Sequence, residues 1–230
     1  MKVIGLIGGL SWESSAEYYR IINQGAQQAL GGVHSARSLI YSVDFGEIEK
    51  MQHDGDWAAA TAVMVDAARR LERGGANFVL ICSNTMHRMA GEIEAAVSIP
   101  LLHIADPTGA AITAAGYRRI GLLGTAFTME QPFYRARLEE KFQLDVVVPP
   151  AEDRRIVHGI IYQELVKGIV RDASRDQYRA VIQRLIADGC EAIILGCTEI
   201  MLLVGATDSA VPLFDTTTLH AEAALARALG

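Results

Sequence analysis

The stretch Gly75-Ala-Asn-Phe-Val-Leu-Ile-Cys-Ser-Asn-Thr85 opens with a small turn, continues as an apolar run and ends in polar side chains. A short, fully apolar run of this kind is typical of a strand that is buried on both faces, as in a parallel sheet covered by helices. A similar stretch returns later as Gly189-Cys-Glu-Ala-Ile-Ile-Leu-Gly-Cys-Thr-Glu199. The strand and its polar exit are therefore repeated in the chain.

Two further pairs of segments keep the same order. Ile4-Gly-Leu-Ile-Gly8 returns as Ile120-Gly-Leu-Leu-Gly124, and Ile99-Pro-Leu returns as Val211-Pro-Leu213. In chain order, the three pairs are separated by 116, 114 and 112 residues. One match between apolar strands is unremarkable, but three in register indicate two similar halves.

Short apolar runs alternate with alanine-rich helical patterns along the whole chain. The predicted strands are Val3–Gly8, Ser38–Val43, Phe78–Cys82, Leu101–Ala105, Ile120–Gly124, Leu144–Val148, Ala192–Gly196 and Pro212–Phe214. The clearest helical patterns are Trp57–Arg73, Tyr178–Asp188 and Thr218–Leu229. This alternation predicts the α/β class, with parallel sheets flanked by helices.

Composition and charge exclude several classes of protein. The 230 residues are 50% hydrophobic and 21% charged, which is typical of a globular protein. With 21 Lys+Arg against 27 Asp+Glu, the chain lacks the concentrated positive surface that nucleic acid requires. No apolar run approaches the ~20 residues that cross a bilayer. The start, MKVIGLIGGLSW, has no small-residue cleavage site. We expect a soluble protein that binds neither nucleic acid nor membrane.

The cysteines and glycines argue against a metal, a disulfide framework or a nucleotide. Cys82, Cys190 and Cys197 are odd in number and have no CxxC spacing. The histidines are scattered, so we predict no metal site, and the free thiols indicate the reducing cytoplasm. The Gly5-Leu-Ile-Gly8-Gly9 turn is not G-x-G-x-x-G and no Gly-Lys-Ser/Thr follows it, so a phosphate cradle is missing.

The candidate site lies where the repeated strands end, because ligands of open α/β sheets bind beyond the carboxyl ends of the strands. Cys197 follows one strand and precedes an expected helix, whose N-terminus would lower the pKa of its thiol. The alternative is a buried structural cysteine. The Ser83-Asn84-Thr85 turn is suited to hold a carboxylate through backbone N–H groups, or else to cap a helix. The repeat pairs Ser83 with Cys197.

Four motifs resemble the aspartate/glutamate racemase family: GLIGGLSWESSAEYY, SNTMH, GTAFTMEQPFY and ILGCTEI. The resemblance covers essentially the whole chain and is closest to the L-aspartate/glutamate-specific racemases of enterobacterial type. It implies two pseudo-symmetric α/β domains with the active site in the cleft between them, and a homodimer. It also implies racemisation of a small acidic amino acid with no cofactor, neither pyridoxal phosphate nor metal.

The resemblance also assigns domains and residues. The family's C-terminal segment crosses back, so residues 1–98 plus about 210–230 form the first domain and about 99–209 form the second. The resemblance implies that Cys197 is catalytic. The residues implied to bind substrate follow the strands or, for Gln52, lie in a polar loop after the second strand: Leu10, Gln52, Asn84, Thr85, Thr125, Thr128, Thr198 and Glu199.

The chain departs from the family at one catalytic position. Many relatives read CNT where this sequence reads SNT, so Ser83 replaces the first of two catalytic cysteines. Cys82 is no substitute, because neighbouring side chains of a strand point to opposite faces. We expect Cys197 to remove the α-proton and Ser83 to return one. A serine hydroxyl needs a neighbour to take its proton; the sequence offers no strong candidate, and His87 is only conceivable.

Two other functions remain open at this level. Malonate-type decarboxylases of the same superfamily fit a single catalytic thiol, because one thiol is enough to protonate an enediolate. Cis-trans isomerases of the superfamily are a further alternative. A non-catalytic cytosolic binder of small acidic ligands fits the two-lobed fold. Fold analogy alone does not separate these functions.

Overall fold

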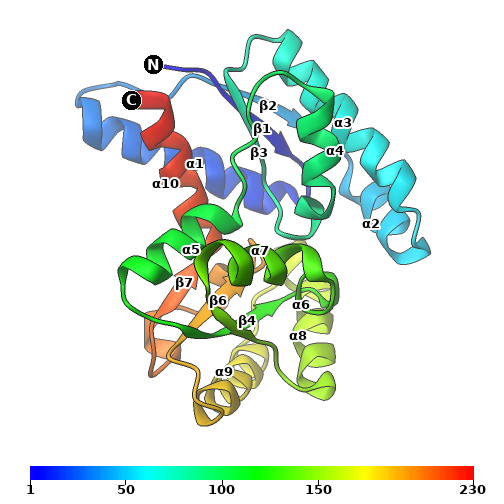
Figure 1. Cartoon of the computed structure of the whole chain (residues 1–230), viewed down its shortest axis with the longest axis vertical. Helices are drawn as coiled ribbons and strands as arrows, with labels where there is room; N and C mark the ends of the chain where they lie inside the picture. The colour runs from blue at the N-terminus through cyan, green and yellow to red at the C-terminus, as the bar shows by residue number, and fades with distance from the viewer. The chain divides into compact units, whose positions relative to one another are not determined.

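The computed structural model describes all 230 residues, which form two compact units (Figure 1). The first unit comprises Met1–Ile104 and His220–Gly230, and the second comprises Ala105–Leu219. The chain passes from the first unit to the second after Ile104 and returns to the first at His220. Both points come later than the expected boundaries near residues 98 and 210. The second comes later because Leu213–Asp215 pairs with Ala192–Gly196 in the second sheet. None of the helices is both long and apolar enough to cross a membrane.

The first unit contains a three-stranded parallel sheet. Its strands are β1 (Ile4–Gly8), β2 (Ser38–Ser42) and β3 (Phe78–Ile81), in the order β2-β1-β3. Its helices, some of them short 3-10 turns, are α1 (Trp12–Leu30), α2 (Phe45–Asp54), α3 (Trp57–Arg73), η1 (Thr85–Met89), α4 (Ala90–Ala96) and most of α10 (Thr216–Leu229).

Helices cover both faces of this first sheet (Figure 1). Ile4 and Leu6 point to the face that α1 and α10 cover, where they pack with Tyr18. Ile7 points to the other face and packs with residues of α3 such as Met64. This alternation follows from the twofold period of a strand. It explains why β1 is apolar along its whole length.

The second unit contains a four-stranded parallel sheet with the order β5-β4-β6-β7. Its strands are β4 (Arg119–Gly124), β5 (Asp145–Val147), β6 (Ala192–Gly196) and β7 (Leu213–Asp215). Its helices are α5 (Ala105–Ala114), α6 (Ala126–Glu130), α7 (Pro132–Phe142), α8 (Ala151–Gln163), η2 (Leu165–Lys167), α9 (Asp172–Ala187), η3 (Ile200–Leu202) and η4 (Ala206–Asp208). Helices α8 and α9 pack against β4, and α7 packs against β5. The predicted fold class is confirmed.

The internal repeat corresponds to equivalent positions in the two sheets. Strand β1 lies between β2 and β3, and strand β4 lies between β5 and β6. In this comparison β3 and β6 hold equivalent places in the two sheets. The third repeated segment also has the same place, since Leu101 bridges to Val79 of β3 and Leu213 pairs with Ile193 of β6. The two halves therefore share their strand order as well as their motifs.

The predicted strand Leu101–Ala105 is wrong beyond its first residue. Leu101 makes only an isolated bridge to Val79, and α5 begins at Ala105. The backbone leaves the sheet because the Ile104 N–H donates to the ring of His87 at 3.1 Å instead of to a strand. A side chain distant in sequence thus ends the strand early.

The N-termini of α1 and α6 are capped earlier than two sequence patterns suggest. Ser14-x-x-Glu17 and Thr128-x-x-Gln131 resemble capping boxes, but the capping side chains are Ser11 and Thr125. Their hydroxyls accept hydrogen bonds from the backbone N–H groups of Ser14 and Thr128 at 3.4 and 3.2 Å. Each helix therefore begins almost directly after the preceding strand.

Gly9 makes this rapid turn from β1 to α1 sterically feasible. Its φ of 79° lies in the left-handed region, which other residues adopt at a cost. A Cβ at this position would overlap the Val43 carbonyl oxygen and lie 2.6 Å from the Val43 nitrogen. Gly55 has a similar φ of 74°, but a Cβ there would meet no atom within 4 Å.

These two glycines give a matched test of the turn. Both Gly9→Ala and Gly55→Ala place an alanine in the left-handed region, which costs ~1–2 kcal/mol. Gly9→Ala also pushes the main chain of Val43 away, so we expect it to lower the free energy of unfolding by a further ~1–3 kcal/mol. Urea denaturation of both variants measures the difference. Equal losses would contradict the close approach at Gly9.

Candidate active site

Most of the polar candidate residues lie at the carboxyl ends of neighbouring strands within each unit; Gln52, in helix α2, is the exception. In the first unit, Ser83 follows β3, which pairs with β1. In the second, Thr125 follows β4 and Cys197 follows β6, and the last residues of these two strands, Gly124 and Gly196, are paired. Parallel strands end at one edge of a sheet, which is where α/β proteins bind ligands.

The first unit places most of its selected residues around the exit of β3. Ser83, Asn84 and Thr85 are all buried. Gln52 is buried as well, and its Nε2 donates to the Met86 sulfur at 3.1 Å. The segment that contains Gln52 is helix α2, so the predicted polar loop is wrong. Asp44 caps this helix, because its side chain accepts a hydrogen bond from the Gly46 N–H.

Leu10 differs from the other selected residues. Its side chain is buried in the apolar core with Ile7 and Ile48. A leucine side chain has no hydrogen-bonding group, so any polar contact from this position comes from its backbone. The residue is suited to shape the glycine turn.

The predicted low pKa of Cys197 is wrong. No α-helix starts after it, because residues 197–199 form a turn that leads into the three-residue 3-10 helix η3. Burial, together with the charge of Glu199 and the hydrogen bond to it, raises the pKa of the Cys197 thiol well above its ordinary value. A helix dipole needs aligned peptides that this short turn does not supply.

Cys197 and Glu199 form a close pair. The Cys197 thiol donates to Glu199 Oε2 at 3.0 Å, and the Thr198 hydroxyl donates to the same oxygen at 2.9 Å. All three side chains are buried. A carboxylate that accepts the thiol proton's hydrogen bond is also the group placed to receive that proton.

The other two cysteines have different surroundings. Burial raises the pKa of the Cys82 thiol, which packs in the core with Tyr18 on the face covered by α1 and α10. Burial also raises the pKa of the Cys190 thiol. All three cysteines are free thiols. Cys197 is the one that donates a hydrogen bond to a carboxylate.

The second unit brings Thr125 and Thr128, which the sequence singled out, near a histidine and a threonine that it did not, His158 and Thr217. The hydroxyls of Thr125 and Thr128 lie 3.2 Å apart, and both side chains are buried. His158 of α8 accepts the Ala126 N–H through Nδ1 at 3.1 Å, beside the same turn. Thr217 donates to the Thr198 carbonyl at 3.3 Å. No local motif connects such distant partners, so only the fold reveals them.

His87 contacts the backbone of Ser83. Its Nδ1 lies 2.7 Å from the Ser83 carbonyl oxygen, and its Nε2 accepts the Ile104 N–H at 3.1 Å. Both ring nitrogens are thus engaged by main-chain groups. This arrangement does not fit the role of proton acceptor for the Ser83 hydroxyl that we considered from the sequence.

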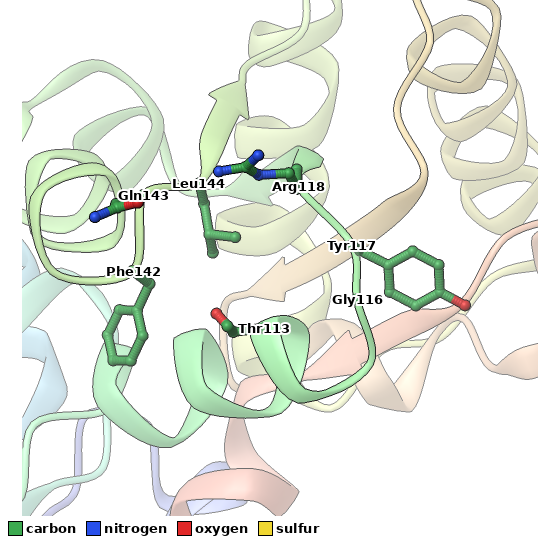
Figure 2. Close-up of a pocket in the computed structure, with 7 residues that line it drawn as sticks. All are labelled: Thr113, Gly116, Tyr117, Arg118, Phe142, Gln143 and Leu144. Atoms are coloured by element: carbon green, nitrogen blue, oxygen red, sulfur yellow. The ribbon is translucent and has the colours of Figure 1, made fainter.

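A cavity of about 330 Å³ in the second unit lies at the opposite end of the sheet (Figure 2). Arg118 precedes β4 and Leu144 precedes β5, so the cavity is at the amino ends of these strands. Its other lining residues are Thr113, Gly116, Tyr117, Phe142 and Gln143. None of the candidate catalytic or substrate-binding residues lines this cavity, so we exclude it from the candidate active site.

Comparisons with known proteins identify the family. The profile of the Asp/Glu/hydantoin racemase family matches residues 7–224. A crystal structure of a Yersinia pestis protein, provisionally described as an Asp/Glu racemase, is 54% identical, covers 100% of both chains and has a TM-score of 0.92. An aspartate racemase homologue from Pyrococcus horikoshii is 32% identical over 100% of both chains, with a TM-score of 0.85. The broad specificity amino-acid racemase RacX of Bacillus subtilis is 23% identical, over 93% of this chain and 92% of its own.

The fold is an α/β fold whose two halves repeat the same strand order. In both halves polar side chains follow the carboxyl ends of the strands, and in one of them this position holds the thiol of Cys197. The chain belongs to the Asp/Glu/hydantoin racemase family, which confirms the resemblance seen in its motifs. It is an amino-acid racemase, and therefore an isomerase.

The pair of Cys197 and Glu199 leads to a prediction about thiol reactivity. Glu199→Gln removes the negative charge that raises the pKa of the Cys197 thiol, so this pKa falls. More thiolate is then present at a given pH, and alkylation of Cys197 by iodoacetamide rises at lower pH than in the parent protein. Mass spectrometry of the alkylated peptide measures the profile.

Glu140→Gln is the control, because Glu140 is an exposed acid in the same unit. We expect its alkylation profile to match that of the parent protein. A profile of Glu199→Gln that stays in place or moves to higher pH would contradict the coupling between the two groups.

Proposed function

We propose that the protein is a cofactor-independent racemase of L-aspartate and L-glutamate, in which Cys197 removes the α-proton and Ser83 returns one to the opposite face. The observation that carries this proposal is the contact between the Cys197 thiol and the Glu199 carboxylate. The repeat supports the second role, because it pairs Ser83 with Cys197 at equivalent strand exits.

The first step uses Cys197 and Glu199 together. The thiol proton passes to Glu199, and the resulting thiolate takes the α-proton of the L-substrate, so that the thiol is restored and the substrate becomes a carbanion. Burial and Glu199 hold the pKa of the thiol high, so the thiolate is scarce at neutral pH but is a strong base once formed. A strong base is what the weakly acidic α-carbon requires.

The developing negative charge on the substrate requires hydrogen-bond donors. No lysine or arginine is among the buried side chains of the chain. Hydroxyls, amides and backbone N–H groups of the strand exits are therefore the proposed donors to the carboxylates and to the enolate-like charge. Donors that are already oriented stabilise such charge most effectively, because they need no reorganisation during the reaction. The proposed donors are Asn84, Thr85, Thr125, Thr128 and Thr198.

Ser83 completes the reaction from the other face. Its hydroxyl protonates the carbanion, and the D-enantiomer is released. The alkoxide left on Ser83 takes a proton from water, and Glu199 gives up to water the proton it received, so both groups are restored for the next turnover. A hydroxyl is far less acidic than a thiol, so proton removal from the D-enantiomer by Ser83 is slow. The equilibrium between enantiomers is fixed by their symmetry. The proposed enzyme therefore exchanges the α-proton of the L-substrate faster than it forms the D-enantiomer.

The acidic substrate is supported by relatives. The Pyrococcus horikoshii protein is described as an aspartate racemase homologue, and the family includes Asp and Glu racemases. RacX is described as having broad specificity, so substrate choice differs within the family. We also propose a cytoplasmic homodimer. The free thiols support the compartment, and the family resemblance supports the dimer.

A decarboxylase of malonates is the second candidate, because this chain has a thiol at one strand exit and a hydroxyl at the other. Release of carbon dioxide from a malonate, without α-proton exchange in amino acids, would replace the proposed racemase by this lyase. Binding of acidic amino acids without turnover, unaffected by Cys197→Ala, would instead indicate a binding protein.

Cys197→Ala tests the base. Proton NMR in deuterium oxide follows the α-proton signals of L- and D-aspartate and of L- and D-glutamate. We expect the parent protein to exchange the L-substrates, and Cys197→Ala to lose this exchange by at least ~10²-fold, as is typical for a missing acid–base group. Cys190→Ala is the control and keeps the exchange. Exchange at near-parental rate in Cys197→Ala would refute the role of this thiol.

Ser83→Cys tests the proposed proton donor on the face of the substrate opposite Cys197. A thiol is more acidic than a hydroxyl, so this variant should remove the α-proton of the D-enantiomer faster and raise racemisation in both directions. The double variant Ser83→Cys/Cys197→Ala should keep exchange of the D-substrate and lose racemisation. If Ser83→Cys brings no gain on D-aspartate or D-glutamate, Ser83 does not face the substrate opposite Cys197.

A further inference from the structure

The turn after β3 uses a side chain where a helix would use its backbone. In an α-helix, the N–H of His87 would bond to the carbonyl of Ser83, four residues earlier. Here the His87 N–H bonds to the Asn84 carbonyl at 3.1 Å, in the tighter 3-10 pattern of η1. The Ser83 carbonyl is thereby left to the His87 ring, whose Nδ1 lies 2.7 Å from it.

The partners of His87 fix the tautomer of its ring. A backbone carbonyl only accepts a hydrogen bond and a backbone N–H only donates one. Nδ1 therefore carries the hydrogen that it donates to the Ser83 carbonyl, and Nε2 accepts from the Ile104 N–H. The ring connects the exit of β3 to the segment that leads into α5.

Other rings hold His87 in place. Its ring centroid lies 4.4 Å from that of His103 and 5.8 Å from that of His220. His220 is itself held, because Nδ1 lies 2.8 Å from the Tyr18 hydroxyl and Nε2 lies 2.8 Å from the Leu102 carbonyl. All three histidines and Tyr18 are buried. The ring of His87 thus has a single, well-supported position.

Holding the Ser83 carbonyl also sets the direction of its neighbours. In a trans peptide, the C=O of Ser83 and the N–H of Asn84 point in opposite directions within one plane. The ring therefore fixes the direction of the Asn84 N–H. It also limits the backbone dihedrals of Ser83, and with them the direction of the Ser83 hydroxyl.

We propose that His87 is a positioning residue for the reaction at Ser83: its Nδ1–H holds the Ser83 carbonyl and so aims the Ser83 hydroxyl and the Asn84 N–H. This inference rests on the proposed function. The ring does not exchange a proton with the substrate. Its contribution is to keep the hydroxyl aligned with the carbanion. A small displacement of a proton donor from its reacting atom slows proton transfer strongly.

The test is a ratio measured in one sample. In deuterium oxide, deuterium enters L-aspartate with retained configuration through Cys197 alone, whereas D-aspartate appears only when Ser83 delivers the proton. Chiral chromatography with mass detection gives both rates. Their ratio does not depend on the fraction of protein that is folded, so a variant that is merely unstable leaves the ratio unchanged.

Two substitutions separate the two ring nitrogens. His87→Asn keeps an N–H donor at the place of Nδ1, and His87→Gln keeps only a group near the place of Nε2. We expect His87→Gln to lower the ratio of D-aspartate formation to retained exchange by about tenfold, the usual effect of one lost hydrogen bond. His87→Asn should restore the ratio to within about twofold of the parent, as expected if the Nδ1 donor is what matters.

His53→Gln is the matched control. His53 is an exposed histidine whose Nδ1 lies 2.9 Å from the carbonyl of Glu49, also four residues earlier. We expect this substitution to leave both rates unchanged. Equal losses of both rates in His87→Gln, with a constant ratio, would show a purely structural role. A ratio in His87→Asn as low as that in His87→Gln would also overturn the proposal.

Failure of the proposed function gives a different result. If the parent protein neither exchanges the α-proton nor forms D-aspartate, the racemase mechanism is refuted, and the role of His87 falls with it. If the parent protein exchanges and racemises, only the ratios of the variants decide the role of His87.

Discussion

The parallel pairing of the buried central strands is the constraint on which the rest of the structure depends. Because β1 pairs with β3 and β4 pairs with β6 in parallel, each sheet gathers its strand exits at one edge. The apolar strands fill the space between the helix layers, so the middle of each sheet has no polar side chains that could bind or react with a ligand. Polar side chains are therefore concentrated where the strands end, and the internal repeat creates this situation twice.

Each half stabilises its strand exit with a side chain that holds a backbone carbonyl. His87 holds the carbonyl of Ser83, and Thr217 holds that of Thr198. Exits of this kind have backbone groups without partners in the sheet, and burial makes an unpaired group costly. The same hydrogen bonds that satisfy the backbone also fix the direction of the neighbouring side chains, so stability and preorganisation have one physical origin.

The two exits differ in chemistry although their folds are equivalent. Cys197 lies in a buried position against the Glu199 carboxylate, and both features raise the pKa of its thiol. Ser83 has a hydroxyl in place of the thiol, and its backbone carbonyl contacts the ring of His87. The proposed racemase is therefore asymmetric: a strong but scarce base acts on one face of the substrate, and a weak acid acts on the other.

The sequence by itself determined the elements and their repetition. Apolar runs, glycine turns and the polar triplets after them are local signals, so the strands, the pairing of Ser83 with Cys197 and the family resemblance were all legible in it. Tertiary structure decided the raised pKa of Cys197, the early end of the strand at Leu101 and the backbone partners of His87. These depend on burial and on hydrogen bonds between segments far apart in the chain, which no local pattern encodes.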